Sequence, residues 1–407
     1  MDDIKLFQLA LGLTPPWQVR DCRFDPTQRR LDIDLDFPKG SEFACPECGA
    51  PAKAYDTQDK QWRHLDFFQH ACQLHARLPR VNCPKCGVRQ VSVPWARPGS
   101  GFTLLFEAYV LALARHMPVL AVAQLVGEHD TRLWRLIDHW VNDARERRDD
   151  SAVQEIGIDE TSSKRGHNYI SVFVDLAQRC VLFATPGKDA ATVEAFARDL
   201  KAHGGDPEKI LEVCSDLSKA FIAGVRDNLT KAKHTFDKFH LIKMLNEAVD
   251  EVRRAEQEER PEALVHTRYL WLKNPANLSC QQLTRLMGFL ESRQTLKTAR
   301  AYRIKLSFQH LFNCNKGDAE RFFKDWYFWA THSRLEPIVK VAKTLLAHQD
   351  GVLRWFRSRV SNGLLEGINS LIQAAKAKAR GYRSVRNLIT MVYLIAGRLD
   401  IRVTHTI

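Results

Sequence analysis

Two kinds of apolar pattern divide the chain into strands and helices. Residues 17–24 and 31–37 predict two strands, and the second alternates apolar and acidic side chains along its length. The DPTQRR stretch between them has the residues of a turn. Residues 62–67 and 70–78 predict a further hairpin, so this part of the chain is expected to be rich in β-structure.

Helical periodicity follows over residues 102–146. Pro118 is predicted to open a short helix that Gly127 ends, and Asp130 to cap the next helix, which starts at Thr131. Two helices joined by a short glycine-containing turn have the layout of a helix-turn-helix. An ordinary helical hairpin has the same pattern, so the prediction of DNA binding depends on neighbouring features.

Strands and helices then alternate in a mixed order. The predicted elements are strands 155–159, 169–176 and 179–187, helix 189–204, strand 209–216, helix 217–229 and strand 232–240. Three antiparallel strands followed by a helix, a strand, a helix and a strand is the order of an RNase H-like fold. Residues 238–350 have helical periodicity almost throughout, which predicts an all-α insertion in that core.

Two short motifs of one form, Cys-Pro-x-Cys-Gly, begin at Cys45 and Cys83. Two residues between thiolates allow both sulfurs to bind one ion, and the following glycine permits a tight turn. A redox Cys-x-x-Cys pair would explain one motif but not two. Two such motifs supply four thiolates, the ligand set of a structural zinc site. The predicted zinc ligands are Cys45, Cys48, Cys83 and Cys86, and the six other cysteines are expected to be buried thiols.

The predicted fold class is therefore multidomain α/β. The predicted domains are N-terminal strands of a β-hairpin with a zinc ribbon (1–100), a helix-turn-helix (101–150), the first part of an RNase H-like mixed α/β core (151–255), an all-α insertion (256–350) and the C-terminal helices of the core (351–407). No internal repeat or low-complexity tract is present in the sequence.

The composition excludes several classes of protein. The chain has 407 residues, 45% of them hydrophobic, which is too much apolar material for a disordered protein. No stretch of about 18 residues is both apolar and free of charge, so no membrane partner is expected. The first residues, MDDIKLFQ, carry acids where a signal peptide carries Lys or Arg, which predicts a cytoplasmic, nucleoid-associated protein with reduced cysteines.

Positive charge is concentrated in residues 351–407. The whole chain has a net charge of +12, and this segment contains ten Lys or Arg but two acids, Glu366 and Asp400. Such a concentration usually faces a polyanion, most often nucleic acid, although a solvated helix face is the alternative interpretation. Double-stranded DNA is therefore the expected partner. The residues expected to contact it are Arg132 and Arg135 of the helix-turn-helix, and Lys376, Lys378, Arg380 and Arg383.

Two aspartates follow apolar strands of the predicted core. Asp159 is expected to end the first strand and Asp216 the fourth, which would place both carboxylates at one edge of the sheet. Two carboxylates there can bind a hard divalent cation, and a third completes a two-metal site for phosphoryl displacement. Glu366 is the third candidate, because it is the one acid within residues 351–399 and has basic residues around it.

Each acid taken alone is weak evidence, since a helix cap or a surface group gives the same pattern. Glu160 and Asp175 are alternatives to Asp159, which is preferred because it directly follows the apolar run. Ser361 or Asn362 is predicted to cap the helix that carries the third acid.

Several segments, in order from about residue 40 to residue 400, carry a resemblance to a known family. They are the two cysteine motifs, the helix-turn-helix, GIDETSSKRGHNYISVFVDL, CSDLSKAF, FDKFHLIKMLNEAVDEVRR and RVSNGLLEGINSLIQAAKAKARGYRSVRNL. Together they resemble the ISL3 family of insertion-sequence transposases. FDKFH and Asn-Gly-x-x-Glu-Gly-x-Asn are the most specific parts of the likeness.

The resemblance implies an Asp-Asp-Glu triad with magnesium or manganese. Carried over residue by residue, the triad falls on Asp159, Asp216 and Glu366. Asp237 and His240 match the family's Asp-x-x-His strand end and are expected to support the catalytic site, with the imidazole near the scissile phosphate.

The implied protein is a DDE transposase that binds terminal inverted repeats and then cuts and joins DNA, at least as a homodimer. One alternative is a zinc-ribbon and helix-turn-helix regulator derived from a transposase, with an idle triad, but the presence of all three acids argues against it. Another is an RNase H-type nuclease without strand joining, which would leave two end-binding modules unexplained.

Overall fold

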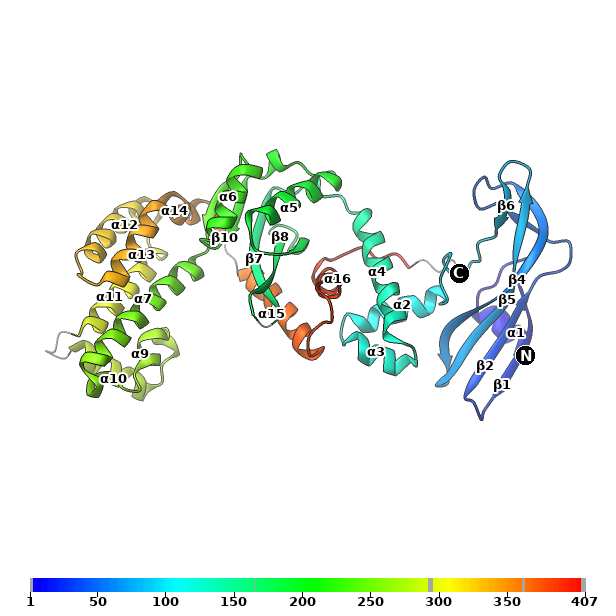
Figure 1. Ribbon diagram of the computed structural model, residues 1–407, viewed down its shortest axis with the longest axis horizontal. Coiled ribbons are helices and arrows are strands. Elements are labelled where there is room, and N and C mark those ends of the chain that lie inside the picture. Colours follow the sequence, from blue (N-terminus) through cyan, green and yellow to red (C-terminus); the bar gives the residue numbers. More distant parts are fainter. Residues whose placement is uncertain (1–2, 165, 292–295, 361–362, 404–407) are drawn as a thin grey trace. The chain divides into compact units, whose positions relative to one another are not determined.

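The computed structural model describes residues 3–164, 166–291, 296–360 and 363–403. Within them the chain forms two compact units, whose elements can be followed in Figure 1. Unit 1 holds the residues up to Arg147, together with Ala374–Ile395 and a short segment from Leu399. Unit 2 holds Arg148–Gln373 and Ala396–Arg398. Among the described residues, no helix is long and apolar enough to cross a membrane.

Unit 1 begins with a helix and a six-stranded sheet. The elements are α1 (Asp3–Ala10), β1 (Gln18–Asp25), β2 (Arg30–Asp36), β3 (Glu42–Ala44), β4 (Pro51–Phe67), β5 (His70–Cys83) and β6 (Gly87–Gln90). The strands lie in the order β1-β2-β5-β4-β3, and β6 pairs with β5. The strands predicted over 17–24 and 31–37 are confirmed as β1 and β2. The predicted hairpin is confirmed as β4 and β5, which extend well beyond the expected ends.

Both faces of β2 are covered, although its sequence alternates apolar and acidic residues. On one face Ile33 is buried in an aromatic core, where the rings of Trp17 and Trp95 lie 4.9 Å apart. On the other face Asp36 is also buried, because Arg77 of β5 pairs with it at 2.7 Å. The acidic face of β2 is therefore tied to neighbouring strands by ion pairs.

Three helices follow the sheet of unit 1. They are α2 (Leu104–Ala114), α3 (Val119–Val126) and α4 (Asp130–Glu146). Gly127 ends α3 with a left-handed backbone (φ 65°), which its missing side chain allows. The predicted cap of α4 was wrong, because His129 caps the helix: its Nδ1 accepts from the amide of Thr131 at 3.3 Å. Asp130 is already the first residue of α4.

Residues after 381 pack on α4. In helix α16 (Val385–Ala396), Thr390 donates a hydrogen bond to Asp138 of α4 at 2.7 Å. Arg386 pairs with the same carboxylate at 2.9 Å. These residues therefore lie with the helix-turn-helix in unit 1. The finer division into five domains stays a prediction.

Unit 2 is built on a five-stranded mixed sheet. Its elements are β7 (Glu155–Lys164), β8 (Asn168–Asp175), β9 (Cys180–Pro186), α5 (Ala190–Ala202), η1 (Pro207–Lys209), β10 (Glu212–Ser215), α6 (Lys219–Asn228) and β11 (Lys233–Phe236). The strand order is β11-β10-β7-β8-β9. Strands β7, β8 and β9 are antiparallel, whereas β10 and β11 run parallel to β7. Side chains of α5 and α6 share one apolar core with the sheet.

Two predicted strand ends in this sheet were wrong. Strand β7 does not end at Asp159 but continues to Lys164, because it pairs with β8 as an antiparallel hairpin over its whole length. The strand expected over 232–240 ends at Phe236, and Asp237 is the N-cap of helix α7 (Lys238–Glu259).

Helices continue from α7 to α15. The further elements are α8 (Pro261–Leu264), α9 (Arg268–Leu272), η2 (Pro275–Asn277), α10 (Cys280–Glu291), α11 (Lys297–Leu311), α12 (Lys316–Thr331), α13 (Glu336–Ala347), α14 (Gln349–Ser358) and α15 (Gly363–Lys378). Their aromatic core includes Trp271, whose ring lies 5.6 Å from that of Tyr302. The two expected caps of α15, Ser361 and Asn362, lie outside the described residues.

Candidate functional site

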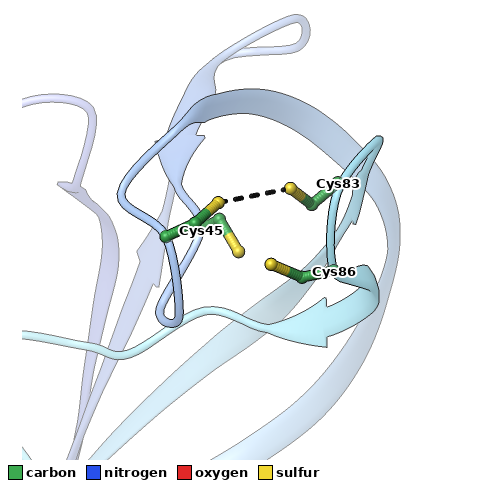
Figure 2. Close-up of side chains that lie close together, drawn as sticks. Cys45, Cys83 and Cys86 are labelled. Atoms are coloured by element: carbon green, nitrogen blue, oxygen red, sulfur yellow. Dashed lines mark hydrogen bonds between the residues drawn. The ribbon is translucent and has the colours of Figure 1, made fainter.

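The two cysteine motifs come together at two neighbouring hairpins. Cys45 and Cys48 lie between β3 and β4, and Cys83 and Cys86 lie at the turn between β5 and β6. The four sulfur atoms lie within 4.8 Å of one another, and those of Cys48 and Cys83 are 3.5 Å apart. Figure 2 shows the sulfurs of Cys45, Cys83 and Cys86 pointing toward a common centre.

The local backbone explains why each motif ends in glycine. Gly49 and Gly87 have left-handed backbones (φ 72° and 74°), which a residue with a side chain rarely adopts. Backbone amides of Cys86 and Lys85 donate to the sulfur of Cys83, and these bonds lower its pKa to about 7. A thiolate is therefore available near neutral pH, and four sulfurs at these distances fit a tetrahedral zinc ion.

Among the described residues, the other cysteines and histidines do not join this cluster. Cys72, Cys180 and Cys214 are buried, as expected. The expectation was wrong for the other three, since Cys280 is exposed and Cys22 and Cys314 are half-buried. Nδ1 of His64 lies 2.9 Å from the hydroxyl of Thr103.

Three aspartates occupy one level of adjacent strands in unit 2. Strand β10 pairs with β7 in a register that brings Asp216, just past the end of β10, beside Asp159. Strand β11 pairs with β10 in a register that brings Asp237 beside Asp216. The amide of Asp237 donates to the carbonyl of Ser215 at 3.0 Å, which continues this pairing past the strand end. Because β10 is short, its end coincides with the middle of β7.

Asp159 is a buried carboxylate among other acids. Burial is the main reason why its pKa is raised to about 6, and the charges of Asp216 and Asp237 raise that pKa further. The amide of Glu160 and the charge of His240 act in the opposite direction. Nδ1 of His240 lies 3.0 Å from Oδ2 of Asp237, and this hydrogen bond raises the pKa of His240. The carboxylates of Asp159 and Asp237 are therefore buried close to other acids, where water solvates their charge poorly.

Helix α15 lies along β7 and contacts it turn by turn. The side-chain amide of Asn369 donates to Oδ2 of Asp159 at 2.7 Å. One turn further along the helix, the side-chain amide of Gln373 donates to the hydroxyl of Thr161 at 2.5 Å. The two contacts are four residues apart on the helix and two residues apart on the strand, and both spacings correspond to about 6 Å along the element. Helix α15 and strand β7 therefore run side by side in the same direction.

The start of α15 is also held against β7. A side chain added at Gly157 would meet Leu365 at 2.3 Å, so backbone and helix approach closely there. Glu366 is the next residue; it is exposed, one turn before Asn369 and about 60° away from it around the helix axis. The helix of the third predicted acid thus docks beside the aspartates. No three of these four acids bring their carboxylate oxygens within 4.8 Å of one another, since the cysteines are the only such group in the described part of the chain.

The two alternative acids lie in other surroundings. The carboxylate of Glu160 lies 3.7 Å from Nζ of Lys188. Asp175 accepts hydrogen bonds from the amides of Ala177 and Gln178, as in a turn after a strand. Neither Glu160 nor Asp175 is therefore a better candidate than Asp159 for the acid cluster.

The two arginines of α4 that were predicted to contact DNA differ in their contacts within the protein. Arg132 pairs with Glu128, and its guanidinium lies 4.3 Å from the ring centre of Phe102, so it is held by its own unit. Arg135 is exposed on α4. The predicted residues near the end of α15 and beyond also belong to unit 1. Among these, Lys376 is half-buried, and Lys378, Arg380 and Arg383 are exposed.

Sequence reasoning missed two residues of the acid site, Asn369 and Gln373. A signal was present, because Asn369 follows Glu366 by three residues and both stand on one side of a predicted helix. Neither side chain carries a charge, so a prediction based on acidic and basic residues does not include Asn369 or Gln373.

Three family models match successive parts of the chain. The model described as the zinc-finger of transposase IS204/IS1001/IS1096/IS1165 matches residues 41–86. The model described as the helix-turn-helix domain of transposase family ISL3 matches residues 91–141. A third, described as transposase, matches residues 156–392, which is more than half of the chain. The class of protein is thus a transposase with two amino-terminal modules, and both predicted modules are confirmed.

The chain belongs to the ISL3 family of transposases, in agreement with the resemblance found in its motifs. The transposase for insertion sequence element IS1557 of Mycobacterium tuberculosis is 30% identical over 438 residues, covering 97% of this chain and 96% of that protein. The transposase for insertion sequence element IS1001 of Bordetella parapertussis is 29% identical over 367 residues, covering 87% and 89% respectively.

Proposed function

We propose that this transposase binds the terminal inverted repeats of its own insertion sequence and cuts and joins DNA there by a metal-dependent DDE mechanism. The observation that carries the proposal is the strand register of unit 2, which sets Asp159 beside Asp216, together with the hydrogen bond from Asn369 of α15 to Asp159. Two acids from the sheet and a helix bearing a third acid are thereby associated in one region.

The strand order supports an RNase H-like core. Three antiparallel strands are followed by two strands parallel to the first, and the order is β11-β10-β7-β8-β9. If the core is RNase H-like, residues 256–350 form an all-α insertion between the strands and α15. The insertion would separate Glu366 from Asp216 along the sequence, while α15 still returns to β7.

We assign magnesium, or manganese, to the acid cluster. Asp159, Asp216 and Glu366 would hold the ion, because hard divalent cations prefer carboxylate oxygens. The fit rests on Asp159, a buried carboxylate whose pKa is raised by burial and by its acidic neighbours, so that a cation would relieve the repulsion. When bound, the ion supplies positive charge for the attacking and leaving oxygens of phosphoryl transfer.

Neighbouring side chains of the chain itself would orient the site. Asn369 and the amide of Glu160 donate to the two carboxylate oxygens of Asp159, and so fix its plane. Asp237 accepts from Nδ1 of His240, so Nε2 can donate to the scissile phosphate when the imidazole ring is protonated. The hydrogen bond to Asp237 favours this charged form of the ring, because it raises the pKa of His240.

The amino-terminal modules would recognise and hold the DNA end. A structural zinc ion on Cys45, Cys48, Cys83 and Cys86 would tie the two hairpins together. Arg135 of α4 is the better placed of the two predicted arginines for contact with DNA, because Arg132 is engaged by Glu128. Synapsis of two ends would require two copies of the chain, so we propose at least a homodimer.

The proposal is tested with the full chain and a duplex that contains its own element end. Asp159→Asn, Asp216→Asn and Glu366→Gln should each lower magnesium-dependent cleavage by about a thousandfold or more, because each removes a charged ligand with little change of shape. Affinity for the uncut duplex, measured by fluorescence anisotropy without metal, should change little.

A matched control is Glu336→Gln, which neutralises a glutamate in the first turn of another helix, α13, and should leave cleavage unchanged. Wild-type protein that binds the end but never cuts it would favour the regulator with an idle triad. Cutting without strand joining would favour a nuclease. Full activity of Glu366→Gln would remove that residue from the triad.

A further inference from the structure

One face of helix α7 forms a wall of a cavity of about 460 Å³ in the helical part of unit 2. Lys243, Glu247, Asp250 and Arg254 line it from α7, and Arg268 lines it from α9. The cavity therefore combines charged side chains from two helices. It is separate from the core of that helical segment, whose side chains are apolar and aromatic.

Arginines outnumber acids around this cavity. The carboxylate of Asp250 is buried and lies 2.8 Å from Arg253, 3.6 Å from Arg254 and 3.7 Å from Arg268. A single carboxylate cannot neutralise three guanidinium groups. Arg254 and Arg268 keep 64% and 57% of their side-chain surface exposed, so their remaining donors face solvent. Such an excess of fixed donors suits phosphate oxygens.

The same helix connects the cavity to the acid cluster. His240 lies in the first turn of α7, and Lys243, Glu247 and Arg254 follow at spacings that keep them on one side of the helix. Lys243 and Arg254 lie about 5 Å and about 21 Å beyond His240 along the helix axis. That interval corresponds to about five phosphates of one DNA strand at 3.4 Å per phosphate.

We infer that this face of α7, completed by Arg268, binds the phosphates of the DNA strand that runs from the scissile position, and we call these residues the α7 groove. The inference rests on the proposed function, because it takes the scissile phosphate to lie beside His240. The occupant is DNA, since the groove offers exposed cations at both ends of an interval of about five phosphates that begins near the proposed catalytic site.

The test is made in the Asp159→Asn background, so that binding is measured without cleavage and does not depend on the triad. A double variant, Arg254→Ala with Arg268→Ala, should bind the element-end duplex about tenfold more weakly at about 0.1 M salt. The slope of log affinity against log salt should fall by about two, one for each lost phosphate contact.

Glu247→Gln is the complementary variant. It removes a negative charge from the groove without removing a cation, so affinity should rise several-fold and no loss of packing is involved, because Glu247 is exposed. Phosphate-ethylation interference should locate the effect of the double variant within about five phosphates of the scissile position. Lys340→Ala, which removes an exposed cation from α13, is the control and should change neither affinity nor slope.

Four results would overturn the inference: an unchanged salt slope in a folded double variant, unchanged affinity in Glu247→Gln, interference confined to the interior of the repeat, or an equal loss in Lys340→Ala. The last would show a general effect of net charge. If the double variant does not fold, Glu247→Gln decides. Absence of cleavage by the wild type would count against the proposed triad and would leave these binding results intact.

Discussion

Asp159 shows what a buried carboxylate beside other acids costs a folded protein. The side chain is buried in β7 next to two further acids, and its pKa is raised from 3.8 to about 6. A carboxyl group with this pKa is protonated more readily in the folded state than in the unfolded chain. It therefore favours folding at low pH, and this contribution is lost as pH rises from about 4 to about 6.

The pH dependence gives a prediction at this residue. Above pH 6 the buried charge should cost about 1–3 kcal/mol of unfolding free energy in the metal-free protein, and Asp159→Asn should remove that cost. Urea unfolding of unit 2 in both proteins measures it. The stability of the variant relative to the wild type should grow by that amount between about pH 4 and pH 7.

Magnesium is the control for this prediction. Added at neutral pH, it should stabilise the wild type and have little effect on the variant, because ligand binding to the folded state adds to stability. A stability difference that is the same at both pH values would contradict the assigned shift. The amide of Glu160 and the side chain of Asn369 each donate to one carboxylate oxygen of Asp159, whereas Asn has a single carbonyl oxygen. Asp159→Asn therefore loses one hydrogen bond at every pH, so the change in the stability difference with pH is the quantity that tests the prediction.

At the scale of elements, the contact between α15 and β7 depends on one missing side chain. Gly157→Ala would place a methyl group 2.3 Å from Leu365, which is itself buried. Overpacking of this kind should cost about 1–3 kcal/mol and displace the start of α15. We expect cleavage to fall with it, because Glu366 and Asn369 move with the helix, and a single-turnover cleavage assay measures the loss.

A double-mutant cycle identifies the cause. Leu365→Ala removes the obstructing side chain, so the two substitutions together should be less destabilising than the sum of the single effects by about 1 kcal/mol or more. Gly288→Ala is the matched control, because a methyl group there meets nothing within 4 Å and lies in helix α10. It should be neutral or slightly stabilising. Additive effects of Gly157→Ala and Leu365→Ala would refute the contact.

The two cysteine hairpins give a further prediction at this scale. Cys83→Ser should lose the zinc ion that we expect at one per chain, and with it the order of both hairpins, because metal binding at such a site supplies folding free energy. Metal analysis of the purified protein measures the stoichiometry. Cys280→Ser is the control, since that exposed thiol lies outside the cluster. Zinc retained in Cys83→Ser would contradict the ligand assignment.

Local patterns predicted the elements better than their ends. The duplicated cysteine motif predicted the cluster, because ligand spacing and a glycine turn are both local properties. The end of β7 was misplaced, since the pairing partner that extends this strand lies further along the chain. Asp159 and Asp216 could be paired from strand order, whereas the contact of Asn369 with Asp159 spans 210 residues, and the place of Asn369 beside Glu366 on a predicted helix does not identify its partner.

For the whole molecule, the segments discussed above lie in two different compact units. The zinc-ribbon and helix-turn-helix modules lie in unit 1, and the acid cluster and the α7 groove lie in unit 2. Similarity to the relative from Mycobacterium tuberculosis covers nearly the whole of both chains, so it extends over the segments of both units.

Unit 1 is assembled from segments that are far apart in the order of synthesis. Thr390, which binds Asp138, follows it by 252 residues. At a translation rate of about 5–20 residues per second, α4 therefore leaves the ribosome roughly 10–50 s before its partner is made. The main segment of unit 2, Arg148–Gln373, is translated within that interval. Unit 1 is thus completed after Asp159 and Asp216 already exist in the nascent chain.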